Sequence, residues 1–92
     1  MNNVKVENFR SERSGREVAN QFRIFTDKGC YFQSYHTVIA FKPFSGKIQL
    51  DINAWDYSVT TGKYRNQFLR ETKKETETKI KSGEYELVDL NS

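Results

Sequence analysis

The side chains best suited to covalent chemistry in this chain are its single cysteine and its single histidine, Cys30 and His36. A thiol activated by an imidazole is a strong nucleophile, but the two groups must lie within hydrogen-bond reach. On an extended strand six residues span about 20 Å, so the pair cannot touch unless the strand breaks between them. We therefore expect a buried thiol, a hydrogen-bonded or exposed imidazole, no catalytic residue and no enzymatic activity.

Metal and cofactor chemistry is also poorly supported. One cysteine excludes an intrachain disulfide and a four-cysteine zinc site. A transition-metal site would have to borrow carboxylates, and none is suitably spaced. We expect no metal and no other cofactor. The cysteine content fits a reducing cytoplasm, and the absence of a signal peptide or a spanning apolar segment predicts no membrane contact.

Binding chemistry is better represented, by arginine and lysine side chains. The chain has a net charge of +3, and residues 10–16 contain three arginines. Such residues can contact phosphates or an acidic partner. The candidate partner- or phosphate-binding residues are Arg10, Arg13, Arg16, Lys63, Arg65, Arg70, Lys73, Lys74 and Trp55. A solvated helix face and a soluble loop explain the same charges, and the modest net charge favours that simpler interpretation.

Two further patterns allow both a functional and a structural interpretation. The hydroxyls of Ser58, Thr60 and Thr61 could hold an anion at a helix start, but N-capping explains them more simply, with Ser58 as the preferred N-cap. Residues 28–35 partly follow the strand pattern of RNA-recognition domains, and they depart from it at the third and fourth places. Core packing is the simpler role for the aromatic residues of that stretch.

A single small domain must position these side chains, because 92 residues accommodate one hydrophobic core. Aromatic residues make up 14% of the chain, so they must form much of that core. Alternating apolar residues and β-branched stretches predict the strands, and Gly- and Pro-containing turns separate them. The predicted strands span residues 4–9, 21–26, 30–41, 47–54 and 84–90. Residues 10–16 are expected to form a loop or mobile hairpin end.

The clearest alternation lies in the predicted strand 47–54. Ile48, Leu50, Ile52 and Ala54 are expected to point inward, and Lys47, Gln49, Asp51 and Asn53 toward water. Trp55 follows on the polar side of that strand. It is expected either to cap the junction with the next helix or to form an exposed contact.

Two helices are predicted in the second half of the chain. The first begins near Ser58, and helical spacing places five residues on one side of it: Thr61, Tyr64, Arg65, Phe68 and Leu69. The stripe of Tyr64, Phe68 and Leu69 is expected to cover the sheet face that carries Ile48, Leu50 and Ile52. Gly62 inside this helix indicates either a close approach of another backbone or a later helix start. The second helix begins at a capping box of Thr72 and Glu75 and ends at Gly83. The fold class is therefore α+β: an antiparallel meander of about four strands, two short helices packed on one face, and a C-terminal strand.

One group of residues resembles a known family. The run 34–40 (Ser-Tyr-His-Thr-Val-Ile-Ala), the Tyr-Ser-Val-Thr-Thr segment at 57–61 and the Phe-Leu pair at 68–69 are similar to a pattern in short bacteriophage and prophage proteins of unknown function. The similarity covers about residues 31–90. The single domain 1–92 would then comprise a family-like core over residues 30–90 and a protein-specific N-terminal strand or hairpin over residues 1–28. The resemblance implies a small phage accessory protein acting in an infected bacterial cytoplasm.

Two functions remain open on this evidence. The first is a phage protein that binds and inhibits a host protein or ribonucleoprotein complex, such as a nucleic-acid-processing or defence complex of the kind that anti-CRISPR proteins inhibit. The alternative is a module that binds DNA or RNA directly through arginine, lysine and aromatic side chains. The sequence leaves the oligomeric state open.

Overall fold

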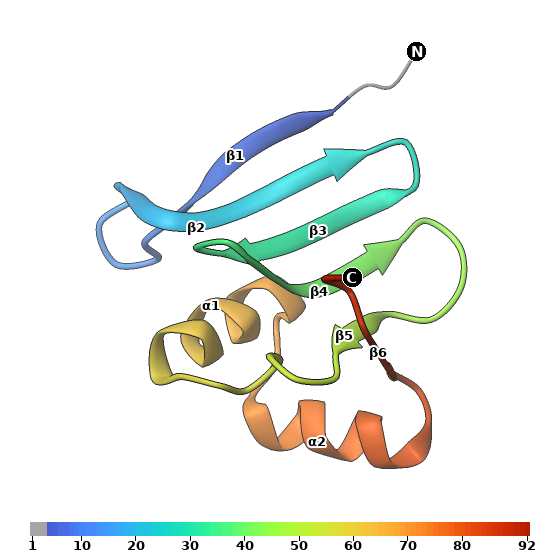
Figure 1. The fold of residues 1–92 in the computed structure, drawn as a ribbon. Coiled ribbons are helices and arrows are strands. Elements are labelled where there is room, and N and C mark those ends of the chain that lie inside the picture. Colours follow the sequence, from blue (N-terminus) through green and yellow to red (C-terminus); the bar gives the residue numbers. More distant parts are fainter. Residues whose placement is uncertain (1–3) are drawn as a thin grey trace.

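The structure is a computed structural model that describes residues 4–92, so residues 1–3 of the predicted N-terminal segment lie outside the described residues. Figure 1 shows one sheet with both helices below it. The elements in chain order are β1 (Lys5–Arg10), β2 (Glu17–Thr26), β3 (Gly29–Ser34), β4 (Thr37–Pro43), β5 (Gln49–Asp51), α1 (Val59–Leu69), α2 (Lys73–Ser82) and β6 (Glu86–Val88). The strands lie in sequence order and are antiparallel, except that β6 runs parallel to β5. The predicted α+β class is confirmed, with six strands.

The single long strand predicted over residues 30–41 is wrong, because the chain reverses at Tyr35 and His36 to form the β3–β4 hairpin. Tyr35 has a φ of 55°, in the left-handed region that glycine and asparagine usually occupy in such turns. The sequence carries neither residue there, so it gives no local signal of the turn. Cys30 lies near the start of β3 and His36 follows its end, so the reversal does not join them.

Aromatic rings form the centre of the core between the sheet and α1. Phe9 of β1, Phe32 of β3 and Phe68 of α1 are at most 1% exposed, and their ring centroids lie 5.0–6.2 Å apart. Leu50 belongs to the same cluster as Tyr64 and Phe68, and Ile48 packs against it, so the predicted packing of the first helix holds for these two residues of the predicted strand but not for Ile52. Because Phe9 contributes a central ring, the N-terminal hairpin is an integral part of the domain.

The strand predicted over residues 47–54 is shorter than expected, and its alternation ends at Asp51. The Asp51 carboxylate is buried and accepts hydrogen bonds from the backbone N–H groups of Asn53 (3.1 Å) and Leu90 (2.9 Å). These bonds stabilise a turn in place of a continued strand. Ile52, predicted to point inward, is consequently 52% exposed.

The start of α1 is as predicted, and Gly62 meets neither of its two expectations, because the helix already begins at Val59 and no other backbone within residues 4–92 lies close to the glycine. The Ser58 hydroxyl accepts the Thr61 N–H at 3.1 Å and caps the helix. Gly62 lies inside the helix, and a Cβ added there would lie 3.6 Å from the Arg65 guanidinium. That distance is an ordinary van der Waals contact, so the fold would accommodate a Cβ at this position.

The second helix has the predicted ends. Thr72 and Glu75 form the capping box, and Gly83 takes a left-handed φ of 83° at the C-cap. Within residues 4–92, no helix is both long enough and apolar enough to cross a membrane.

Candidate macromolecule-binding surface

A groove lies between α1 and the β1–β2 loop, which spans residues 11–16. Figure 1 shows the loop and the helix that border it. The Gln67 side-chain amide donates a 2.9 Å hydrogen bond to the Arg10 carbonyl oxygen, so the helix and the hairpin are joined at one end of it. We call this feature the basic groove. It is lined by Glu12, Arg23, Lys63, Asn66, Gln67, Arg70, Glu71 and Thr72.

The cationic residues of the basic groove come from separate elements. Arg23 lies on β2, with its guanidinium 4.0 Å from the centre of the Phe9 ring, whereas Lys63 and Arg70 come from α1 and its C-cap. Among residues 4–92, no carboxylate lies within 4.0 Å of any of these three cationic groups. Their charges are therefore available to an anionic ligand.

Glu71 is the buried acid of the groove, and its charge is compensated within the chain. Its carboxylate accepts hydrogen bonds from the Thr76 hydroxyl (2.6 Å), the Lys79 ammonium (2.7 Å) and the Tyr85 hydroxyl (2.8 Å). Burial favours a higher pKa for Glu71, but these hydrogen bonds outweigh it and lower the pKa. Burial and the same carboxylate raise the pKa of Tyr85 to about 12. This network joins α2 to the segment before β6.

Glu71 is expected to contribute to the loss of stability in acid. Its pKa in the folded chain lies below the ordinary value of 4.5, so its stabilisation is present above that value and is lost as the pH falls through the folded pKa. Urea unfolding between about pH 6 and about pH 3 should show a smaller acid-dependent loss for Glu71→Gln than for the parent chain. The exposed Glu12→Gln variant is the control. If the free energy of unfolding falls in acid as much for Glu71→Gln as for the parent chain, this role is contradicted.

Arg65 differs from the prediction that placed it on a binding surface, whereas Trp55 takes the first of its two expected roles, a cap over the junction with the helix. The Arg65 side chain is 1% exposed, and its guanidinium donates to the Trp55 carbonyl (2.8 Å), Asp56 (3.1 Å) and the Asn66 side chain (3.0 Å). Its charge also lies 5.2 Å from the partly buried Trp55 ring. Lys73 donates to the other Asp56 oxygen at 2.7 Å. Arg65 therefore joins α1 to the preceding loop from the inside, and Trp55 covers that junction.

The pKa of Asp56 is lowered by this arrangement. Burial favours a higher value, but the hydrogen bonds from Lys73 and Arg65 outweigh it. Asp56, Lys63, Arg65, Asn66 and Lys73 line a second groove together with the start of α1. Since Lys63 and Asn66 line both grooves, they lie on the exposed ridge of α1 between them.

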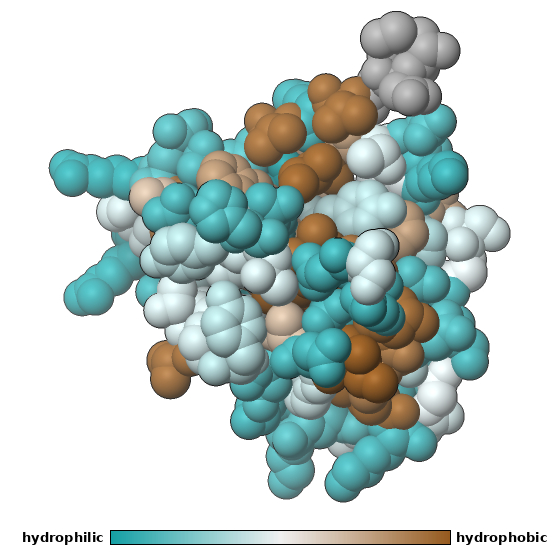
Figure 2. Space-filling view, viewed as in Figure 1, coloured by the Kyte–Doolittle hydropathy of each residue, from teal (hydrophilic) through white to brown (hydrophobic). Residues whose placement is uncertain are grey.

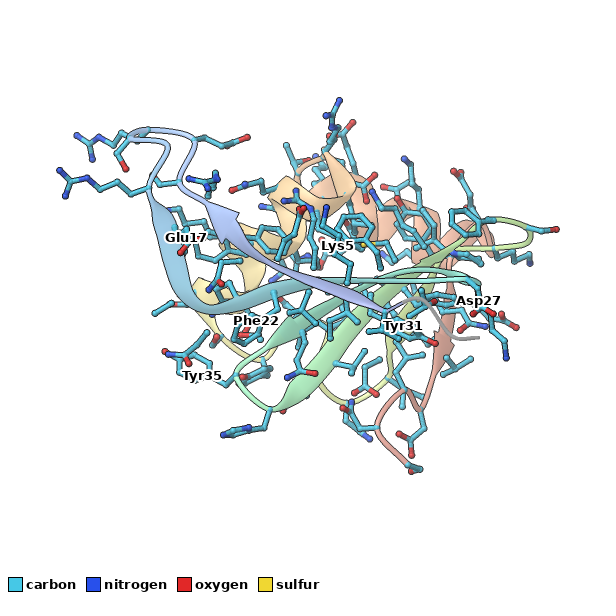
Figure 3. The ribbon with its side chains drawn as sticks, turned by 90° about the horizontal axis from the view of Figure 1, so that it is seen from above. Lys5, Glu17, Phe22, Asp27, Tyr31 and Tyr35 are labelled. Carbon is cyan, nitrogen blue, oxygen red and sulfur yellow. The ribbon has the colours of Figure 1, made fainter. Side chains whose placement is uncertain are left out.

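The structure divides the remaining predicted binding residues into two groups. Arg13 and Arg16 are exposed on the β1–β2 loop, whose side chains extend beyond the sheet in Figure 3. Arg10 supports that loop, because its guanidinium donates to the Gly15 carbonyl at 2.9 Å. Lys74 lies elsewhere, in a groove along α2. The loop, Lys63 and Arg70 are thus brought together, and Lys74 is not.

Sequence reasoning missed Arg23, Asn66 and Gln67. Arg23 lies between two apolar residues of its strand, so alternation places it on the opposite face of the sheet from them. The sequence does not indicate which of the two faces is covered by the helices. Asn66 and Gln67 are ordinary polar positions of an exposed helix face. Only the approach of α1 to the hairpin makes them part of one groove.

Cys30 does not form a reactive centre with His36. Burial raises the pKa of the Cys30 thiol, which keeps it protonated and weakly nucleophilic. Among the described residues, no group of three or more histidine, cysteine, aspartate or glutamate side chains is placed to hold a metal ion.

The fold and the groove define a small α+β domain with a mixed six-stranded sheet, a helical layer on one face and a cationic groove beside its first helix. Residues 4–84 match the family of unknown function DUF8033, and the chain belongs to that family. The match includes β1 and β2, and so extends through the N-terminal hairpin that the sequence pattern had set apart. No curated protein and no solved structure matches the chain.

Proposed function

We propose that this chain is a non-catalytic binding protein of phage or prophage origin, acting in the bacterial cytoplasm, that inhibits a host macromolecule. The best-suited targets are nucleic-acid-processing or defence complexes, including CRISPR nucleases. The observation that supports this most is the basic groove, because it gathers three cations that have no carboxylate partner among the described residues, and the loop that carries the exposed Arg13 and Arg16 borders it through Glu12. The sequence resemblance to short phage proteins supports the biological setting.

The β1–β2 loop is well suited to recognition because its backbone is held in place. The Ser11 N–H donates to the Arg16 carbonyl (2.9 Å), and the Gly15 N–H donates to the Ser11 carbonyl (2.8 Å). The Ser11 hydroxyl also accepts the Arg13 N–H at 3.2 Å. A loop that is ordered before binding loses less conformational entropy in the complex, which increases affinity.

Replacing Arg13 and Arg16 together by glutamine is expected to weaken binding and leave folding intact. Both side chains are exposed, so the free energy of unfolding should change by less than about 0.5 kcal/mol. Affinity capture from bacterial lysate, read by mass spectrometry, should show host proteins retained by the parent and depleted at least about tenfold with the variant. The control Lys47→Gln with Lys81→Gln removes two exposed charges elsewhere.

The same variants provide a functional readout. In a strain with active CRISPR immunity, expression of the parent chain should restore plaque formation by a targeted phage. The Arg13→Gln/Arg16→Gln variant should restore less, and the Lys47→Gln/Lys81→Gln control should match the parent. If the parent chain restores none, CRISPR is not the target, and capture from the same strain then decides whether another host complex is bound.

Direct nucleic-acid binding is the second candidate, favoured by the placement of Arg23, Lys63 and Arg70 along one groove. Tyr64 is only 6% exposed, so it provides no stacking surface to a base. Contacts would therefore be mainly to phosphates, and the logarithm of affinity should fall with the logarithm of salt concentration with a slope near −0.9 per phosphate contacted on duplex DNA. Titration of labelled DNA and RNA at two salt concentrations tests this, and no binding at low salt would reject it.

A further inference from the structure

The strand β1 forms an open edge of the sheet. Among residues 4–92 it pairs only with β2, and Figure 1 shows no other element along its outer side. Such an edge presents unpaired backbone N–H and C=O groups to any strand that fits beside it. The pairing with β2 is regular from Lys5 to Asn8 and shifts between Asn8 and Arg10. The regular part of the edge is therefore short.

The sheet face away from the helices carries an apolar row that ends at this edge. Cross-strand pairing places Val6, Ile24, Tyr31 and Phe41 side by side on four successive strands, and the last two rings stack at 4.2 Å. In Figure 3, Phe22 and Tyr31 project on this face, and in Figure 2 apolar side chains gather over the outer strands. Phe41 is 9% exposed, whereas Val6 is 57% exposed. The apolar row is therefore covered at Phe41 but open to solvent at Val6, where no further strand lies beside β1 among the described residues.

The opposite face of β1 is charged, with Lys5 and Glu7 on either side of Val6. Both charged side chains are exposed, and they form an ion pair of 3.1 Å with each other. The sequence Lys-Val-Glu is self-complementary when two copies run antiparallel. Residues opposite each other in such a pair have their side chains on the same face of the sheet. Val6 would then lie opposite Val6, and each Lys5 opposite a Glu7.

We propose that the edge strand β1 pairs with β1 of a second copy of this chain about a two-fold axis at Val6. The two sheets then join into one, and the apolar row continues across the axis, which buries both Val6 side chains. Two Lys5–Glu7 cross-strand pairs stabilise the opposite face. This dimer does not depend on the proposed function, because the basic groove lies on α1 and the β1–β2 loop.

The charges select this register over its neighbours. A two-fold axis at Lys5 would place the two lysines opposite each other, and an axis at Glu7 would do the same for the two glutamates. Like charges directly opposite destabilise a strand pair. The bulge after Asn8 limits the pairing to residues 4–8. Because both copies use the same edge, the assembly closes at two chains and does not extend into a fibre.

The test is sedimentation velocity of the whole chain from about 1 μM to about 1 mM, the range in which an interface of this size dissociates. The weight-average mass should rise from the monomer value of 10.8 kDa toward twice that value. Val6→Lys should keep the chain monomeric throughout, because it places two like charges at the axis. Ile52→Lys, a similar change at a side chain that is 52% exposed, should behave like the parent.

Charge reversal tests the register. Lys5→Glu should weaken dimerisation by about tenfold or more, since both cross-strand pairs become repulsive. The double variant Lys5→Glu/Glu7→Lys restores both pairs and should restore dimerisation. A parent chain that remains monomeric at the highest concentration would overturn the proposal. So would a dimer that tolerates Val6→Lys, or one that the double variant fails to rescue. Thermal unfolding of each variant confirms that it is folded.

Discussion

Replacement of Phe68 by alanine is expected to lower the free energy of unfolding by about 4 kcal/mol, the largest effect of any single change considered for this chain. The Phe68 ring is 1% exposed and packs against the rings of both Phe9 and Phe32. Its outer side carries the Lys42 ammonium, 4.4 Å from the ring centre. The substitution therefore removes buried apolar area, leaves a cavity and removes a cation–π contact.

Urea unfolding of the parent and the Phe68→Ala variant measures this effect. Phe44 is 79% exposed in the turn after β4, so Phe44→Ala is the matched control and should cost less than about 0.5 kcal/mol. Because Phe9 contacts Phe68, the N-terminal hairpin should unfold in the same transition as the helices. A loss below about 1 kcal/mol in Phe68→Ala, or a separate transition for the hairpin, would contradict this account of the core.

Replacement of Arg65 by alanine is expected to cost about 3 kcal/mol of unfolding free energy. Two of the three guanidinium hydrogen bonds join α1 to the loop before it, and the third goes to Asn66 within the helix. The stem of the side chain packs on the core side of the helix. Without it the Trp55 carbonyl and the Asp56 carboxylate lose their buried donor. The neighbouring Lys63→Ala variant, at an exposed position of the same helix, should be close to neutral.

Arg65→Met separates packing from hydrogen bonding. Methionine keeps much of the side-chain volume but makes no charged hydrogen bond. Among the described residues, the Arg65 Nε is buried without a hydrogen-bond partner, so methionine also removes one unsatisfied donor. The loss in Arg65→Met should therefore be about half of that in Arg65→Ala. Equal losses would show that the hydrogen bonds dominate, and no loss in either variant would contradict a structural role for Arg65.

The features that the sequence determined by itself are those set by neighbouring residues. The Ser58 cap, the Thr72–Glu75 capping box and the left-handed Gly83 all appear where the pattern predicted them. Each depends on hydrogen bonds or backbone angles within one turn of helix, so the residue types are sufficient. The buried stripe of α1, including Phe68, follows equally directly from helical spacing.

Only the tertiary structure decided the features that depend on distant partners. The chain turns at Tyr35 without a turn residue, because the pairing of β3 with β4 imposes it. Asp51 is buried because Leu90, far along the chain, donates to it. Helical spacing places Arg65 on the inward side of α1, but its burial depends on the Trp55 carbonyl and the Asp56 carboxylate that accept its hydrogen bonds. Arg23 reaches the groove only because α1 packs beside the hairpin. For Asp51 and Arg23 the contact is long-range, and no short stretch of sequence contains both of its partners. For Tyr35 and Arg65 the partners are nearer in sequence, but the residue types alone do not specify the pairing.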